Sequence, residues 1–236
     1  YCSRYKHEYG LTREQLGQIA VNGRKNAALT PYAVYKDPMT LEDYLNARMV
    51  STPLGLYDCD VPCDASVAFI ISHKDTVKDC RRGRGVGFEA VGTANTERIS
   101  WDQGDLRYLT GIDGAAKMLW SRTDLRQKDI AMVQLYDGFS FNALCWLEKL
   151  GFCGEGEAGA FLEGGQRIAR DGELPLNTNG GQLSAGRLHG YGFLHEACVQ
   201  LLGEAGARQV PNAPQTAIAS SGGGVPGSAL LLTAPR

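Results

Sequence analysis

Apolar residues recur at helical spacing in several stretches of the chain. The first stretch follows Thr12, which forms the pattern of a capping box with Gln15, and Leu16 and Ile19 then share one face. We expect Pro31 to end this helix, because proline cannot continue the helical hydrogen bonding. Further helices are predicted over residues 40–48, 111–121, 141–150 and 190–203.

Shorter apolar runs between these helices predict strands. Residues 66–72 are apolar without alternation, which is typical of a strand buried on both faces. Four more strands are predicted over residues 86–91, 129–135, 216–219 and 228–233. Strands and helices alternate along the chain, so the predicted fold class is α/β.

Three polar, glycine-rich segments adjoin these strands and helices. They are residues 136–140, 180–192 and 220–227. In α/β folds ligands bind beyond the carboxyl ends of the strands, and loops in that position carry function more often than core segments do. The three segments are therefore the candidate site.

Composition excludes several classes of protein. The 236 residues include 30 glycines and are enough for a buried core, while a net charge of −2 provides no basic surface for nucleic acid. No apolar run reaches the length of a membrane span. Seven cysteines without a secretion signal favour reduced thiols in a cytoplasmic protein. Cys59 and Cys63 have zinc-compatible spacing, but no second pair follows them, so no metal site is predicted.

The three candidate segments resemble the C-terminal signature blocks of the thiolase superfamily, and most closely those of its sterol-carrier-protein branch. Residues 136–140 resemble the His-Asp-Cys-Phe block, residues 180–186 the block that runs into Gly-His-Pro, and residues 220–224 the Cys-x-Gly block. Residues 56–59 also resemble that branch. The resemblance implies a thiolase-like layered fold, here its C-terminal half with the end of its N-terminal half.

The residues that carry thiolase chemistry are replaced in this chain. Tyr136 stands at the His of His-Asp-Cys-Phe, Arg187 at the His of Gly-His-Pro, and Ser220 at the Cys of Cys-x-Gly. Claisen chemistry needs a group that exchanges protons near neutral pH, which neither a serine hydroxyl nor an arginine does. The replaced pattern instead resembles the steroid side-chain-cleaving aldolases, which are thiolase homologues of the lipid-transfer-protein type.

This resemblance implies a carbon–carbon lyase that acts on a β-hydroxyacyl-CoA. The aldolases are implied to split a 17-hydroxy steroid side chain, carried on CoA, into a 17-keto steroid and propionyl-CoA. CoA is then part of the substrate, and no separate cofactor is expected. A homodimer and a small partner protein of the OB-fold and zinc-ribbon type are also implied. Two alternatives stay open: a non-catalytic homologue that binds acyl-CoA or lipid, and an ordinary acyl-CoA acyltransferase.

A retro-aldol cleavage needs a base for the hydroxyl proton and hydrogen-bond donors for the enolate oxygen. Our hypothesis assigns proton transfer to Tyr136 and Tyr191, with the acid and the base left open. Because a tyrosine titrates near pH 10, Arg187 or His189 would favour the phenolate, and Asp137 would orient one of these two residues.

The remaining predicted site residues would contact substrate. Arg187, Ser220, Gly222 and Gly138 are assigned to substrate binding, with Ser220 and Gly138 leaving room. We expect a wide apolar pocket, whose partial lining would be Phe139, Phe141 and Trp146 unless these belong to the core. The basic run at residues 81–84 is a candidate CoA phosphate site or, more simply, a solvated linker.

The resemblance also divides the chain. Residues 1–57 would be the end of the thiolase loop domain, residues 58–83 the last strand region of the N-terminal half, and residues 84–236 the C-terminal domain. We therefore expect the chain to be the back part of a longer enzyme. Alone it would be poorly soluble or inactive, because the strand at residues 67–71 would be an exposed edge.

Overall fold

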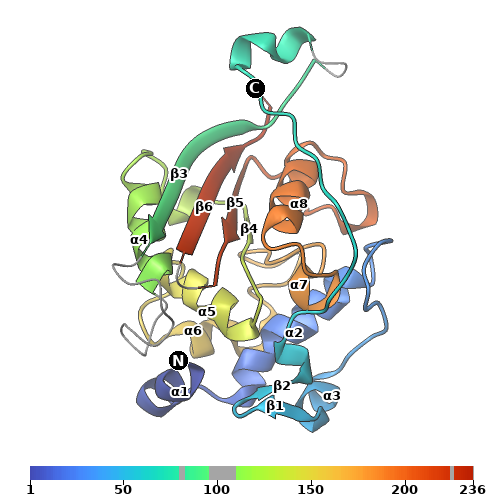
Figure 1. Ribbon diagram of the computed structural model, residues 1–236, viewed down its shortest axis with the longest axis vertical. Coiled ribbons are helices and arrows are strands. Elements are labelled where there is room, and N and C mark those ends of the chain that lie inside the picture. Colours follow the sequence, from blue (N-terminus) through green and yellow to red (C-terminus); the bar gives the residue numbers. More distant parts are fainter. Residues whose placement is uncertain (80–82, 96–109, 224–225, 236) are drawn as a thin grey trace.

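The computed structural model describes residues 1–79, 83–95, 110–223 and 226–235 (Figure 1). Within these ranges a four-stranded mixed sheet forms the centre of the molecule, in the order β3–β6–β5–β4. β4 and β5 are parallel, whereas β6 runs antiparallel to both β5 and β3. The strands are β3 (Gly87–Asn95), β4 (Met132–Gln134), β5 (Thr216–Ser221) and β6 (Pro226–Thr233). The sheet and its helices confirm the predicted α/β class.

Helices lie on both faces of this sheet (Figure 1). α4 packs so closely on β3 that a side chain at Gly92 would collide with the carbonyl of Ala115, while α8 lies against β4 and β5 on the opposite face. The helices are α1 (Cys2–Tyr9), α2 (Arg13–Ala27), α3 (Leu41–Asn46), α4 (Thr110–Trp120), α5 (Ser140–Lys149), α6 (Ala158–Leu162), α7 (Gly181–Ser184) and α8 (Tyr191–Leu201). Short stretches of 3-10 helix occur at Leu56–Asp58, Lys74–Asp79, Gln127–Asp129, Glu163–Gly165 and Gly206–Arg208. None of the described helices is long and apolar enough to cross a membrane.

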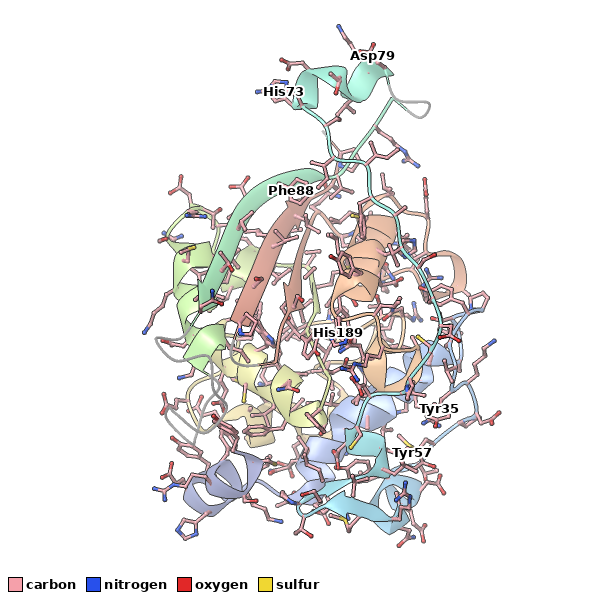
Figure 2. All side chains as sticks on the ribbon, viewed as in Figure 1. Tyr35, Tyr57, His73, Asp79, Phe88 and His189 are labelled. Carbon is pink, nitrogen blue, oxygen red and sulfur yellow. The ribbon has the colours of Figure 1, made fainter. Side chains whose placement is uncertain are left out.

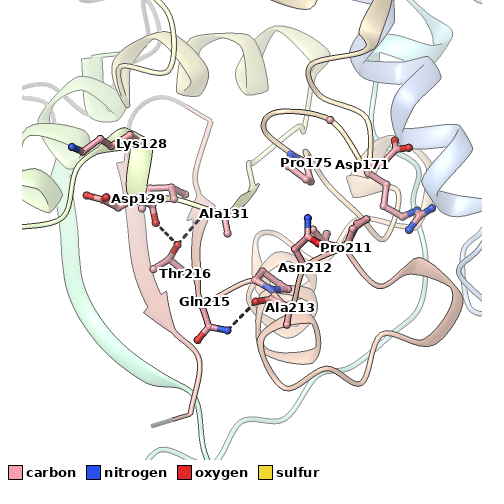
Figure 3. A pocket seen from close by; sticks show the side chains of 15 residues that line it. Lys128, Asp129, Ala131, Asp171, Pro175, Pro211, Asn212, Ala213, Gln215 and Thr216 are labelled. Atoms are coloured by element: carbon pink, nitrogen blue, oxygen red, sulfur yellow. Dashed lines mark hydrogen bonds between the residues drawn. The ribbon is translucent and has the colours of Figure 1, made fainter.

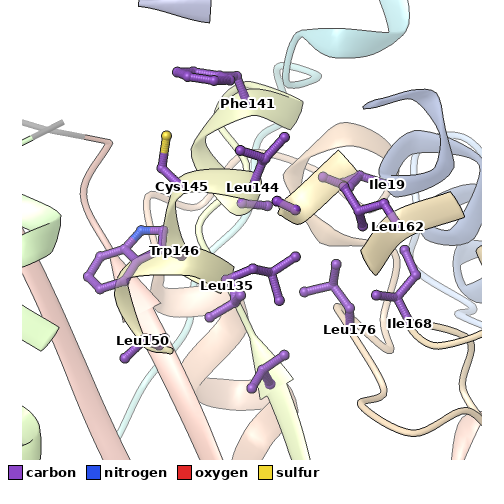
Figure 4. Packing of buried hydrophobic residues seen from close by; sticks show 14 of the residues in the cluster. Ile19, Leu135, Phe141, Leu144, Cys145, Trp146, Leu150, Leu162, Ile168 and Leu176 are labelled. Atoms are coloured by element: carbon purple, nitrogen blue, oxygen red, sulfur yellow. The ribbon is translucent and has the colours of Figure 1, made fainter. Parts of the chain in front are cut away.

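The largest core surrounds α5, which is buried along almost its whole length (Figure 4). Trp146, Leu144 and Leu147 are fully buried, and Phe141 is only 4% exposed. Burial of such side chains stabilises the fold by roughly 1.5–3 kcal/mol each. Helix α5 begins directly after residues 136–139, so this core holds the first candidate segment in place.

The predicted capping box of α2 is confirmed. The Thr12 hydroxyl accepts a hydrogen bond from the Gln15 amide, and the Gln15 side chain accepts one from the Thr12 amide. α2 ends at Ala27, a few residues before Pro31. The second predicted helix, residues 40–48, ends earlier at Asn46, because the chain turns into a short antiparallel pair of strands, β1 (Met49–Ser51) and β2 (Leu54–Gly55).

The strand predicted over residues 66–72 is wrong. The segment is extended but pairs with no described strand, and it runs past α8 as an open strap, with Ile70 95% and Ile71 74% exposed. An apolar pattern indicates burial but specifies no hydrogen-bonding neighbour, which a strand also needs. Figure 2 shows His73 and Asp79 at the outer end of this strap, away from the sheet.

Other boundaries differ by a few residues. β3 extends to Asn95 instead of residue 91, because its whole length pairs with β6. β4 is shorter than the predicted residues 129–135, because the chain enters it through the turn Gln127–Asp129. The pattern did not predict α1, β1, β2, α6 or α7, most of which are too short to show a clear period.

A buried ion pair anchors α8. The Glu196 carboxylate, with no exposed surface, accepts hydrogen bonds from the Arg208 Nε at 3.0 Å and from the Thr178 hydroxyl at 2.8 Å. Gln200 Nε2 also donates to Glu196, at 2.9 Å. Because the pair is desolvated and fully hydrogen-bonded, each partner depends on the other.

We expect Arg208→Leu to lower the free energy of unfolding by about 3–5 kcal/mol, because it leaves the Glu196 carboxylate buried without its cation. Urea unfolding followed by circular dichroism measures the change. The matched control is Arg167→Leu, which breaks an exposed pair with Glu173 at 3.6 Å and should change stability by less than about 1 kcal/mol. Equal losses in both variants would contradict this role for burial.

Candidate functional site

The three candidate segments meet where β4 and β5 end and α8 begins. The Tyr136 amide donates a hydrogen bond to the Ser220 hydroxyl at 2.8 Å, which ties the first segment to the third. The Ser221 hydroxyl donates to the carbonyl of His189 at 3.0 Å, which ties the third segment to the second. These contacts bring together the parts of the chain that the sequence singled out, although residues 224 and 225 lie outside the described ranges.

A buried carboxylate joins the first segment to α7. Asp137 is 2% exposed, and its oxygens accept hydrogen bonds from the Gln182 amide at 2.8 Å and from Asn177 Nδ2 at 3.0 Å. Burial raises the pKa of Asp137 to about 7, although these hydrogen bonds oppose the rise. A side chain at Gly181 would lie 2.0 Å from Asp137 Oδ2, so only glycine fits there.

Arg187 and His189 face a different carboxylate, Asp60. Arg187 Nε lies 3.2 Å from Asp60 Oδ2. Burial raises the pKa of Asp60, while the positive charges of Arg187 and His189 lower it. The hydrogen bonds of Asp137 go to α7 and Asn177, so Asp60, and not Asp137, is the carboxylate beside Arg187 and His189.

Backbone hydrogen bonds fix the segment that carries Asp60. The Asp60 amide donates to the Gly138 carbonyl at 3.2 Å, and the next amide, of Val61, donates to the Gln182 carbonyl at 3.0 Å. The Val61 carbonyl accepts from the Arg187 amide at 2.9 Å. The segment is therefore held between two of the candidate loops. Sequence reasoning missed Asp60, although it directly follows residues 56–59, which resemble the sterol-carrier-protein branch.

Tyr136 stays protonated at neutral pH. Burial raises the pKa of Tyr136 above the ordinary value, and Asp60 raises it further. The Gln182 side chain and Arg187 act in the opposite direction and lower this pKa, but by less than burial raises it. The predicted influence of Arg187 has the expected sign, but burial outweighs it. A neutral phenol is a hydrogen-bond donor, which suits a group that faces a developing negative charge.

The Tyr136 ring occupies the space that we had assigned to substrate. A side chain at Gly138 would lie 2.7 Å from Tyr136 Cε1, and one at Gly223 would lie 3.2 Å from the same atom. The edge of the ring also meets Phe193 on α8, with ring centroids 6.4 Å apart. These glycines therefore make room for the tyrosine itself.

The expected pocket lined by Phe139, Phe141 and Trp146 is wrong. Phe141 and Trp146 belong to the core around α5 (Figure 4). Phe139 lies outside it and is 46% exposed. Trp146 Nε1 donates to the Gly222 carbonyl at 3.3 Å, and Gly222 has a φ of 85° in the turn after β5. Gly222 therefore shapes the turn, because a side chain there would lie 2.2 Å from the carbonyl oxygen of Pro226.

An open cleft of about 490 Å³ lies elsewhere, beside Tyr191 on the α8 face of the sheet. Tyr191 is the first residue of α8, is 61% exposed, and stacks on Phe69 of the strap with ring centroids 6.3 Å apart. His189 and Ser220 also line the cleft. Its apolar lining comes from Val91, Leu194, Ala219 and Leu230.

Two further hollows lie on other parts of the described surface. One of about 460 Å³ lies under the start of the strap, between Val34 and Leu188, and shares the α7–α8 loop with the site. The other, of about 330 Å³, lies at the amino ends of β4 and β5 near Lys128 and Pro211 (Figure 3). None of the eight predicted site residues lines this last hollow, so it is separate from the candidate site.

The basic run and the cysteines add no further ligand group to the described structure. Residues 81 and 82 lie outside the described ranges, and Arg84 pairs with Glu204 at 2.8 Å. No disulfide forms between the described cysteines. No group of three or more His, Cys, Asp or Glu side chains gathers as metal ligands would in the described part of the chain.

Comparisons with known proteins show the family to which this chain belongs. The model of the thiolase C-terminal domain-like family matches residues 92–233. The chain is 34% identical to the steroid side-chain-cleaving aldolase of Thermomonospora curvata, over 100% of this chain and 61% of that protein. It is 35% identical to the 17-hydroxy-3-oxo-4-pregnene-20-carboxyl-CoA lyase of Mycobacterium tuberculosis, over 97% of this chain and 60% of that protein.

A solved structure matches as well. The Ltp2-ChsH2(DUF35) aldolase superimposes with a TM-score of 0.88 and 31% identity, over 99% of this chain and 62% of that one. This chain thus spans about three fifths of the length of these relatives. The match at residues 92–233 lies within the predicted C-terminal domain, residues 84–236, whose boundaries stay predictions.

We expect Asp60→Asn to lower the pKa of Tyr136 by about one unit, which is typical for the loss of one nearby charge. The sign follows because the Asp60 carboxylate raises this pKa, and its removal leaves the positive charge of Arg187 unopposed. The measurement is a pH titration of phenolate absorbance, from which the same titration of Tyr136→Phe is subtracted.

The matched control for this titration is Asp124→Asn, which removes an exposed carboxylate on the loop between α4 and β4. It should leave the pKa of Tyr136 unchanged. A pKa that stays constant, or rises, in Asp60→Asn would show that Asp60 does not act on the phenol.

Proposed function

We propose that this chain carries the site of a retro-aldolase that splits a β-hydroxyacyl-CoA into a ketone and a shorter acyl-CoA. The chain belongs to the thiolase C-terminal domain-like family, and the proposal starts from that membership. The observation that carries the proposal is the protonated Tyr136 at the end of β4, with its backbone fixed by Ser220. Tyr136 stands at the position where the thiolase pattern has a histidine. Tyr191, the first residue of α8, lines the cleft.

The reaction balances without an oxidant, a reductant or a further cofactor. A base removes the proton of the β-hydroxyl, and its oxygen forms the carbonyl of the ketone as the adjacent carbon–carbon bond breaks. The electron pair of that bond becomes the enolate of the thioester, which is protonated on carbon to give the shorter acyl-CoA. CoA enters and leaves as part of the substrate and the product.

We assign proton transfer and enolate stabilisation to Tyr136 and Tyr191. A neutral phenol directed at the thioester oxygen stabilises the charge that develops on the enolate. Both residues lie at the same end of the sheet, where Ser220 contacts the Tyr136 backbone and lines the cleft beside Tyr191. Because Tyr136 is protonated, it suits the role of acid and hydrogen-bond donor, which leaves the role of base to Tyr191. A pH profile of kcat for each variant tests this division.

The substrate that fits best is a bulky apolar acyl group such as a steroid side chain. The cleft beside Tyr191 has about 490 Å³ and an apolar lining, within the range of sites for molecules of that size. Two relatives are named for the cleavage of steroid substrates. We therefore propose a 17-hydroxy steroid side chain on CoA as the substrate of the whole protein, with a 17-keto steroid and propionyl-CoA as products.

The whole protein would act in an assembly. The solved structure that this chain resembles is named as Ltp2 together with ChsH2(DUF35). By this likeness we propose a small partner of the OB-fold and zinc-ribbon type, and a homodimer of the enzyme subunit. The cytoplasm is the compartment that suits a CoA-dependent enzyme whose described cysteines form no disulfide.

We expect Tyr136→Phe and Tyr191→Phe each to lower kcat at least about 100-fold, because each loses the hydroxyl of a proton-transfer pair. The full-length protein with its partner is incubated with a β-hydroxyacyl-CoA, and the released ketone is measured. The matched control is Tyr9→Phe, whose hydroxyl donates to Glu155 on the surface and which should keep its rate.

The same assay separates the alternatives. Binding of acyl-CoA without ketone release by the unmodified protein would identify a non-catalytic homologue. Release of acetyl-CoA from a β-ketoacyl-CoA in the presence of free CoA would identify an acyltransferase. Near-normal ketone release by both tyrosine variants would remove the proposed mechanism.

A further inference from the structure

One buried amide in the site has no hydrogen-bond partner. Gln182 is 3% exposed, and neither its Oε1 nor its Nε2 completes a hydrogen bond within the described part of the chain. A buried amide left in this way is unfavourable by about 1–3 kcal/mol, and folded proteins keep few of them. Such a group is expected where function requires it.

The backbone of Gln182 is fixed, so its side chain cannot easily withdraw from the site. Its amide donates to Asp137 Oδ1 at 2.8 Å, and its carbonyl accepts from the Val61 amide at 3.0 Å. The preceding Gly181 admits no side chain beside Asp137. Gln182 is therefore held in the first turn of α7.

The Gln182 side chain approaches the Tyr136 hydroxyl. It lowers the pKa of Tyr136, although the larger effect of burial raises that pKa. A group that lowers the pKa of a phenol favours its negatively charged form, as a hydrogen-bond donor to the oxygen does. In a carboxamide this donor is the Nε2 amide.

We propose that Gln182 is a positioning residue for Tyr136, whose Nε2 donates a hydrogen bond to the phenol oxygen after a small rotation of the side chain. The phenol proton is then directed away from Gln182 and towards the substrate. This inference rests on the proposed function, because it concerns the aim of the Tyr136 hydroxyl in the retro-aldol step. Gln182 itself gives up no proton, since a carboxamide does not titrate.

The charges around Tyr136 explain why a neutral donor suits this place. Asp60 and Asp137 are the negative groups near the phenol, Arg187 is the positive one, and His189 faces Asp60. Arg187 is already paired with Asp60. An amide orients the phenol oxygen without adding a charge that would alter this balance.

The test is Gln182→Met in the full-length protein, which removes both polar atoms and keeps the length of the side chain. We expect the pKa of Tyr136, measured by phenolate titration against Tyr136→Phe, to rise. We also expect kcat to fall about 10-fold, as for the loss of about 1.4 kcal/mol, while KM stays within about twofold. Gln182→Glu, a second variant of nearly equal shape, should raise the pKa further because it adds a negative charge.

The matched control is Gln134→Met. Gln134 is a fully buried glutamine on β4 that also has an unpartnered oxygen, but its Nε2 donates to the Thr178 hydroxyl at 2.8 Å. This variant should lower the free energy of unfolding by about 1 kcal/mol and leave the pKa of Tyr136 and kcat unchanged.

A pKa of Tyr136 that is the same in Gln182→Met, Gln182→Glu and the unmodified protein would overturn the proposal. So would an equal shift in the Gln134→Met control. Because the titration needs no substrate, the test is independent of the proposed function. An unmodified protein that releases no ketone would refute the aldolase and leave the role of Gln182 to be decided by the titration.

Discussion

The candidate site depends on the burial of one carboxylate, Asp137. A carboxylate removed from water must find hydrogen-bond donors, and Asp137 finds them in the first turn of α7 and in Asn177. This requirement fixes α7 against the end of β4 and leaves no room for a side chain at Gly181. Tyr136 precedes Asp137, and Gln182 follows Gly181. The contacts of the Asp137 carboxylate therefore fix the positions of both Tyr136 and Gln182.

A second carboxylate, Asp60, lies beside the charged residues of the candidate site. Its backbone lies between two candidate loops, and its side chain pairs with Arg187. Burial is the main reason that Tyr136 remains a protonated phenol, and Asp60 acts in the same direction by raising its pKa against the positive charge of Arg187. Such a site is suited to stabilising a developing negative charge, and the positions at which the thiolase pattern has a cysteine and the Gly-His-Pro histidine hold Ser220 and Arg187.

The sequence was informative wherever local chemistry alone decides the structure. The capping box of α2 and the convergence of the three glycine-rich loops follow from spacing and strand order, and the structure has both. Residues 66–72 were misleading, because an apolar run does not specify the strand with which it would pair. Asp60 was missed for a related reason: its importance arises from contacts with Gly138 and Arg187, which are distant in sequence.

The glycines show how the tertiary structure changes the meaning of a sequence feature. A glycine where the thiolase pattern has a cysteine suggests space for substrate, and Gly138 was predicted to leave such space. In the structure the ring of Tyr136 fills that space, and Gly223 bounds it on another side. The large side chain of Tyr136 therefore requires glycine at positions 138 and 223. The open space near the site is instead the cleft beside Tyr191, which is lined by side chains from α8, β3, β5 and β6.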